Sequence, residues 1–158
     1  MSVFWTKFVE VIMGCIGSVG FAILFNVRGK KLVAAGVGGL LSWGIFVLLE
    51  PLHAGEPLRY FIVAVLMSLY SEIMARLLKT PTTTFLMTSL IPLVPGGSLY
   101  YTMAAMLQGD WTVFREKGAS TVSLAVALAL GIVVTAALLK MINVSRTNFR
   151  RWRMQNQR

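Results

Sequence analysis

The chain has 158 residues, of which 56% are hydrophobic and only 13% are charged, and its mean hydropathy is +0.73. So little polar surface cannot cover a soluble globule, and the composition therefore predicts an all-α, polytopic integral membrane protein made of one transmembrane domain. The net charge of +9 does not indicate nucleic-acid binding, because basic residues in membrane proteins mark cytoplasmic loops and no soluble domain offers a basic face.

The first predicted span covers residues 3–25. Glu10 lies near its start, and no basic region with an Ala-x-Ala cleavage site accompanies it, so we expect a retained span and not a cleaved signal peptide. The single cysteine, Cys15, forms no internal disulfide and is interpreted as a small packing residue. Small residues recur along one side of this span and predict the close approach of a neighbouring helix. They are Gly14, Gly17, Ser18 and Gly20.

The second predicted span, residues 32–49, follows a short basic turn over residues 26–31. A loop with two prolines and a glycine comes next, over residues 50–59, and it contains His53. We expect His53 to be solvated, because no second histidine and no cysteine lies near it in the sequence. The sequence predicts neither a metal site nor a cofactor.

The third predicted span, residues 60–78, carries Glu72 and Arg76 four residues apart and therefore on one helix face. An isolated carboxylate two turns inside a span is costly, so Glu72 must be paired, neutral or hydrated. Two interpretations stay open. One is an intrahelical ion pair in which Arg76 reaches the headgroups, and the other is a proton carrier that couples transport to a gradient.

The fourth predicted span, residues 83–107, carries helix breakers near its middle. No charged residue lies between Lys79 and Asp110, a stretch of about 45 Å as a helix, against a hydrocarbon core of roughly 30 Å. Two prolines and two glycines interrupt this stretch between Pro92 and Gly97. Since proline removes an N–H donor and glycine has little helical preference, the sequence predicts a span broken near the bilayer midplane.

A second half-helix after Gly97 would begin with unpaired N–H groups and a partial positive charge. Such helix ends bind carboxylates in transporters with discontinuous helices. We therefore predict a substrate site at Pro95, Gly96, Gly97 and Ser98, unless Ser98 caps these groups itself. A kink that serves packing alone is the other interpretation, but it does not need four helix-weakening residues.

Hydroxyl side chains precede the predicted break. They either bond to backbone carbonyls that the break frees or line an access path. They are Thr80, Thr82, Thr83, Thr84, Thr88 and Ser89.

The fifth predicted span, residues 119–141, follows a polar loop over residues 108–118 and precedes a basic tail over residues 142–158. We expect the tail to be cytoplasmic, in solvent or on the headgroups. Five spans put the termini on opposite sides of a cytoplasmic membrane. The N-terminus is predicted outside, because this orientation leaves few basic residues there. Those residues are Lys7, Arg59, Arg115 and Lys117.

Three groups of residues resemble the threonine/serine exporter family. They are Phe25-Asn-Val, then Glu72-Ile-Met-Ala-Arg76 with Pro81, and Ile91-Pro-Leu-Val-Pro-Gly96 followed by Tyr100. More narrowly, the whole chain is similar to the short stand-alone subunit that corresponds to the C-terminal half of fused exporters. The resemblance implies a longer partner subunit that holds the other half, and it implies threonine and serine or small dicarboxylates such as succinate as substrates.

The sequence shows no nucleophile elbow, phosphate loop or paired intramembrane carboxylates, and an enzyme is not predicted. Our functional prediction is the membrane subunit of a two-component secondary transporter that exports small carboxylates, with Glu72 and Arg76 as candidate coupling residues. The alternative is a non-transporting structural or regulatory subunit that stabilises a longer partner. A third possibility is a channel-like pore formed by a higher oligomer of this chain.

Overall fold

The computed structural model describes residues 2–52 and 55–155, with side chains within residues 5–51 and 55–142. Over these residues the chain is helical and contains no strand, as the composition predicts. His53 lies outside the described residues, so its solvated state stays a prediction.

The described residues form a series of helices that confirms the predicted fold class. Four helices are long and apolar enough to cross a membrane, and a bent pair, α4 with α5, adds a fifth if it counts as one span. The chain is therefore a multi-pass membrane protein. In chain order the elements are α1 (Ser2–Leu24), α2 (Lys30–Leu48), the 3-10 turn η1 (Glu50–Leu52), α3 (Glu56–Leu78), α4 (Thr82–Leu90), the 3-10 turn η2 (Ile91–Leu93), α5 (Gly96–Leu107) and α6 (Trp111–Gln155).

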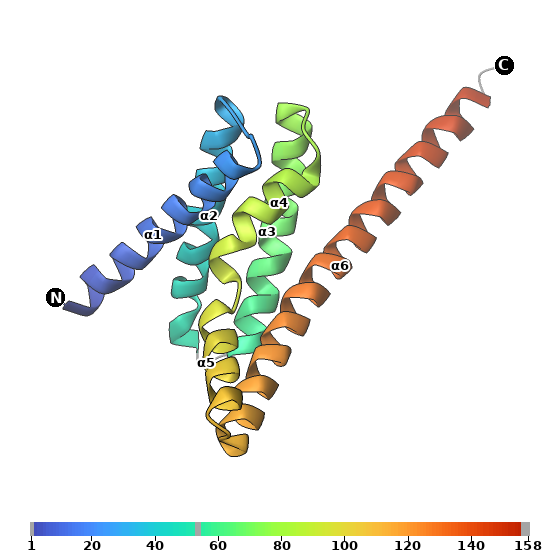
Figure 1. Cartoon of the computed structure of the whole chain (residues 1–158). Helices are drawn as coiled ribbons and strands as arrows, with labels where there is room; N and C mark the ends of the chain where they lie inside the picture. Colours follow the sequence, from blue (N-terminus) through green and yellow to red (C-terminus); the bar gives the residue numbers. More distant parts are fainter. Residues whose placement is uncertain (1, 53–54, 156–158) are drawn as a thin grey trace.

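Helices α2, α3 and α4 pack against one another and form the centre of the molecule. Helix α1 lies against α2, and α6 lies against α3 and α5. Figure 1 shows α1 and α6 on opposite sides of this centre, each leaning away from it toward its own chain terminus. Large apolar side chains on both helices are exposed, among them Ile16 and Val133, as expected for surfaces that face lipid or another membrane protein.

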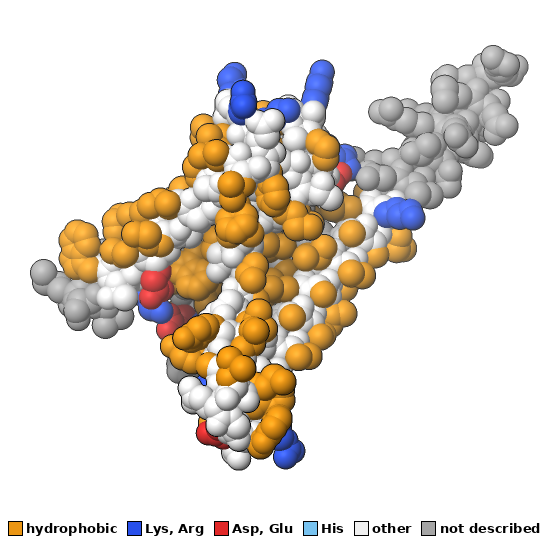
Figure 2. Space-filling model, viewed as in Figure 1, with side chains coloured by type: hydrophobic (Ala, Val, Ile, Leu, Met, Phe, Trp, Pro, Cys, Tyr) orange, Lys and Arg blue, Asp and Glu red, His pale blue; other side chains and the backbone are white. Residues whose placement is uncertain are grey.

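Two turns lie together at one end of the bundle, the top in Figure 1. One joins α1 to α2 and the other joins α3 to α4, and Figure 2 shows basic side chains over both. We call this the basic end, after Arg28, Lys30, Lys31 and Lys79. Its cytoplasmic placement remains a prediction from the charge distribution.

The turn between α3 and α4 closes with a left-handed residue. Lys79 has φ 48° and ψ 52°, and the Thr80 N–H donates to the carbonyl of Ala75 at 3.0 Å. This arrangement satisfies a carbonyl at the helix end, and Pro81 then prevents α3 from continuing. The chain reverses here and sends α4 back along α3.

Two predicted loops are wrong for part of their length. The loop predicted over residues 108–118 ends at Asp110, because the Asp110 carboxylate accepts a hydrogen bond from the Val113 N–H at 3.1 Å and starts α6 there. Helix α3 begins at Glu56, inside the loop predicted over residues 50–59. Its proline, Pro57, is tolerated because the first turn of a helix needs no N–H donor there.

Helix α6 continues through most of the predicted tail, residues 142–158, and ends at Gln155. No glycine or proline follows Gly131 to interrupt it. The cytoplasmic location of this tail stays a prediction from the charge distribution.

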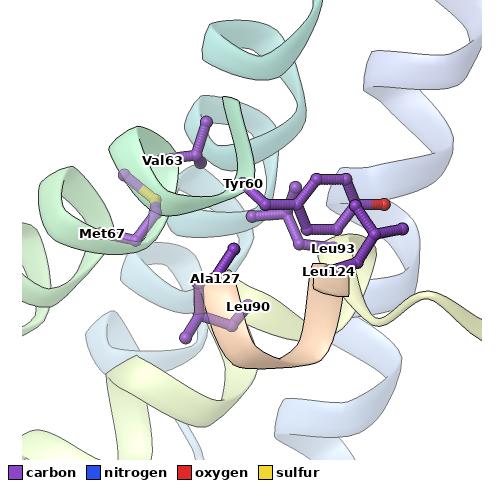
Figure 3. Close-up of a cluster of buried hydrophobic side chains, with 7 residues drawn as sticks. All are labelled: Tyr60, Val63, Met67, Leu90, Leu93, Leu124 and Ala127. Atoms are coloured by element: carbon purple, nitrogen blue, oxygen red, sulfur yellow. The ribbon is translucent and has the colours of Figure 1, made fainter. Parts of the chain in front are cut away.

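The main apolar core joins three parts of the chain around the bent pair (Figure 3). Its buried residues are Tyr60, Val63 and Met67 of α3, Leu90 and Leu93 beside the bend, and Leu124 and Ala127 of α6. Because the side chain of Leu93 is fully buried, the bend is held by packing on α3 and α6.

Helices α3 and α6 approach so closely at Gly131 that no larger residue fits. A Cβ added there would lie 2.7 Å from the Ala64 Cβ and 2.8 Å from the Phe61 carbonyl oxygen. By contrast, no described atom lies within 4 Å of a Cβ added at Gly20 of α1. The two glycines therefore differ in packing while both occupy helix interiors.

We expect Gly131→Ala to destabilise the folded chain, since overpacking costs about 1–3 kcal/mol. Gly20→Ala is the matched control, and it should be neutral or stabilising because alanine favours the helix. Thermal unfolding of the purified chain in detergent measures both. Equal midpoints for the two variants would contradict the close approach of α3 and α6.

Candidate functional site

The break in the fourth span forms at its prolines, as predicted. Helix α4 ends at Leu90, η2 makes one tight turn, and Val94 is extended with φ −60° and ψ 123°. Pro92 has no N–H to continue the helical bonding, and Pro95 disfavours the helical conformation of Val94. The two helical halves consequently meet at an angle of 57°.

Helix α5 begins at Gly96, slightly earlier than predicted, so both glycines are helical residues and not part of the break. The Gly96 N–H donates to the Val94 carbonyl at 2.6 Å, and the Leu99 N–H donates to the Pro95 carbonyl at 3.0 Å. Among the described residues, nothing accepts a hydrogen bond from the N–H groups of Gly97 and Ser98. No side chain caps α5, because Pro95 occupies the cap position and Ser98 lies inside the first turn.

The start of α5 is also open to its surroundings. Gly96 and Gly97 are exposed, and a Cβ added at either residue would meet no described atom within 4 Å. Neither the packing of this chain nor a left-handed φ requires glycine at these positions. An unpaired N–H is costly against lipid tails, so this surface must face water, a ligand or another protein.

The other side of the break packs closely against α1 and α2. A Cβ at Gly14 of α1 would lie 3.5 Å from the Pro92 Cβ and 3.1 Å from the Trp43 Cβ. A Cβ at Gly38 of α2 would overlap the hydroxyl of Ser89, which immediately precedes Leu90. Of the four small residues predicted to let a helix approach the first span, Gly14 places α1 against the break and Ser18 contacts Gly39, whereas a Cβ added at Gly17 or Gly20 would meet no described atom within 4 Å.

Three serine hydroxyls lie fully buried at this junction, one each on α1, α2 and α4. They belong to Ser18, Ser42 and Ser89, and none has a hydrogen-bond partner among the described residues. Ser18 lies against Gly39 just as Ser89 lies against Gly38. The sequence places Ser18 among small packing residues and gives no signal at Ser42, because nothing local to either residue shows that its hydroxyl is unpartnered.

The predicted coupling residues lie apart from the predicted substrate residues. The Glu72 carboxylate accepts hydrogen bonds from Arg76 Nε at 2.9 Å and from the Thr82 hydroxyl at 2.9 Å. Arg76 Nη2 also approaches the same carboxylate to 2.8 Å. Thr82 is the first residue of α4 and lies ten residues, about 15 Å of helix, before Pro92. Glu72 therefore joins α3 to the start of α4 and does not reach the break.

Glu10 is an acidic residue near the break, although the sequence suggested no functional role for it. It lies on α1, the helix whose Gly14 contacts Pro92. Glu10 precedes Gly14 by one helical turn, about 6 Å, and Trp43 Nε1 donates to its carboxylate at 3.4 Å. Lys7 lies 3.9 Å from Glu10 and 2.8 Å from Glu50. The hydrogen bond that the Lys7 ammonium donates to the Glu50 carboxylate lowers the pKa of Glu50. Figure 2 shows acidic and basic side chains together beside α1.

The hydroxyls that precede the break have several different partners. Thr88 donates to the carbonyl of Thr84 at 2.9 Å and Thr80 to that of Leu78 at 3.0 Å, whereas Thr82 bonds to Glu72 and Ser89 has no described partner. Two of these hydroxyls thus bond to backbone carbonyls, but the acceptors belong to Leu78 and Thr84, which precede the break and are not carbonyls that it frees. An access path along the rest stays a prediction.

Comparison with known protein families finds a match over most of the chain. The family model described as threonine/serine exporter, ThrE, matches residues 10–138. This range includes α2 to α5 entirely, and with them the break and both glycines at the start of α5. No solved structure matches the chain.

We expect Ser89→Ala to leave the stability of the chain unchanged or to raise it, because a buried hydroxyl without a partner costs about 1–3 kcal/mol. Ser71→Ala is the control, since the equally buried Ser71 hydroxyl donates to the Met67 carbonyl at 2.7 Å. Its loss should cost about 1 kcal/mol. Chemical denaturation in detergent compares the two. A loss for Ser89→Ala as large as that for Ser71→Ala would mean that the Ser89 hydroxyl has a partner.

Proposed function

The chain belongs to the threonine/serine exporter family, and from this premise we propose that it is the membrane subunit of a two-component secondary transporter. Its cargo in this proposal is threonine and serine or a small dicarboxylate such as succinate. Its partner is a longer membrane subunit of the same family. The proposal places both in the cytoplasmic membrane, with the N-terminus of this chain outside and the basic end inside.

The observation that carries the proposal is the open, uncapped start of α5. Residues Thr82–Leu93 rise about 18 Å from the basic end, which is near the middle of a hydrocarbon core of roughly 30 Å. At that depth the N–H groups of Gly97 and Ser98 need an acceptor, and a substrate carboxylate supplies one. The partial positive charge at the start of α5 favours the same group.

In this proposal the substrate site consists of Pro95, Gly96, Gly97 and Ser98. Pro95 holds the chain out of helical geometry just before α5, and the two glycines leave space for a ligand to approach the backbone. The half-buried Ser98 side chain makes no hydrogen bond to the described residues, so its hydroxyl is available to a polar substrate.

A longer partner would close the open side of this site. A unit with five spans crosses the membrane an odd number of times. If such a unit is duplicated, its two copies lie in opposite orientations, which is the inverted-repeat plan of many secondary transporters. Substrate sites in such transporters lie between the two repeats. One half of the site is then contributed by α5 of this chain and the other half by the partner.

Glu72 and Arg76 form the proposed coupling pair. The carboxylate of Glu72 holds both Arg76 and Thr82, so its protonation would weaken the contact between α3 and the start of α4. Because α4 leads directly into the break, this change offers a route from a proton to the substrate site. The route depends on movement of α4 and not on contact between Glu72 and the substrate.

The alternative is a non-transporting subunit that stabilises its partner, and one observation favours it. Pro92 packs closely on Gly14, so the break also serves the packing of this chain. Export by the partner alone in liposomes, at the rate of the pair, would support this alternative and overturn the first proposal.

We expect Gly96→Leu to abolish or reduce export at least tenfold at unchanged membrane levels, because leucine would fill the space over the open N–H groups. The measurement is export of threonine, serine and succinate from cells that co-express the partner. Gly20→Leu provides the control, since that position is also helical, exposed and open. Export by Gly96→Leu equal to that of the control would remove the substrate site from the start of α5.

We expect Glu72→Gln to abolish the dependence of export on a pH gradient, because glutamine keeps the shape of the side chain without the titrating group. Thr82→Val is the matched variant, since it removes the hydrogen bond to Glu72 but retains the carboxylate. Transport assays at two imposed pH gradients measure both variants. Since the proposed route passes through the contact between Glu72 and Thr82, Thr82→Val should also reduce the gradient dependence, whereas gradient-driven export by Glu72→Gln would contradict the role.

A further inference from the structure

The α1–α2 turn and the α3–α4 turn lie side by side at the basic end (Figure 1), and residues of both line a pocket of about 330 Å³. Asn26, Arg28 and Lys31 line it from one side, and Thr80 and Thr84 line it from the other. The transport proposal does not use this pocket. Its volume is about ten times the roughly 30 Å³ that one water molecule occupies in the liquid, so it has room for more than a single ion.

The polar lining suits an anion. It contains two cations, Arg28 and Lys31, and no acidic residue. Arg28 Nε donates to the Asn26 side-chain oxygen at 3.0 Å, and Asn26 is held in a left-handed conformation with φ 57°. The turn therefore orients Arg28. The Thr84 hydroxyl makes no hydrogen bond to another described residue and can donate to a ligand.

The pocket also has an apolar part, formed by Phe25 and Val27. The Phe25 side chain is 55% exposed although it lies at the end of a membrane-spanning helix. A free phosphate or carboxylate gains nothing from such a wall. A lipid does, because its phosphate is attached to an apolar body that begins at the same depth of the membrane.

We propose that this pocket binds the phosphate of an anionic lipid headgroup. Arg28, Lys31 and Thr84 contact the phosphate, and Phe25 contacts the glycerol and the first acyl carbons. Basic pockets between spans at a membrane surface are suited to such headgroups. Binding there would join the α1–α2 turn to the α3–α4 turn, which are the two connections at this end. The proposal concerns the chain alone and does not depend on transport.

The neighbouring basic residues offer a matched control. Lys30 and Lys79 lie at the same end but do not line the pocket. If the basic end attracted lipid only through its overall charge, any two of these cations would contribute equally. A built pocket instead requires Arg28 and Lys31 in particular.

The test measures lipid binding by native mass spectrometry of the full chain in nonionic detergent, titrated with phosphatidylglycerol or phosphatidylcholine. We expect the double variant Arg28→Gln/Lys31→Gln to weaken phosphatidylglycerol binding at least tenfold. Lys30→Gln/Lys79→Gln, with the same net charge, should change it less than threefold. Equal losses in the two double variants would overturn the pocket in favour of general surface charge.

Two further arms cover the remaining outcomes. Thr84→Val keeps every charge, and we expect it to weaken phosphatidylglycerol binding about threefold, so the proposal stays testable if the double variant does not fold. Wild-type binding by Thr84→Val would overturn the role of its hydroxyl. Inorganic phosphate and glycerol phosphate should compete only at a concentration at least a hundredfold higher than the lipid. Competition at equal concentration would instead identify the pocket as a site for a soluble phosphate.

Discussion

A membrane-spanning chain must satisfy its backbone polar groups, and the rest of this structure depends on a break within a span where the described residues leave two N–H groups unpaired. Pro92 and Pro95 interrupt the fourth span, and α5 restarts with the N–H groups of Gly97 and Ser98 unpaired among the described residues. In water such a helix start is ordinary. Within a bilayer it requires a polar partner, because lipid tails accept no hydrogen bond. The break is therefore the feature that connects the fold to transport.

The packing around the break is asymmetric: one side is covered by other helices, and the other side is open. One side is closed: Leu93 lies in the core with α3 and α6, and Pro92 rests against Gly14 of α1. The other side is open at Gly96 and Gly97. A rigid support behind an exposed helix start is what a binding site needs, because the N–H groups are held in place before a ligand arrives. The buried serines at the same junction show that this packing includes hydroxyls without described partners.

The two ends of the bundle differ in chemistry. At the basic end, turns that join neighbouring helices bring cations together around a pocket, and Glu72 fastens α3 to the start of α4. Toward the other end, Lys7 bonds to Glu50, and Glu10 lies one helical turn from the contact between α1 and the break. On the face that Figure 2 shows, charged side chains gather toward the two ends and beside α1, while the buried unpartnered hydroxyls near the break are those of Ser18, Ser42 and Ser89.

The membrane class, the helical spans and the position of the break could be predicted from the sequence, because apolar length and the missing N–H of proline are properties of a short stretch of chain. The sequence located loops less well: Asp110 starts α6 early, and nothing ends that helix before Gln155. What surrounds the break could not be predicted in this way, because it depends on how the helices pack. That Glu72 meets Thr82, that Glu10 lies nearer the break, and that the start of α5 is open depend on contacts between residues far apart in the chain, which no local pattern records.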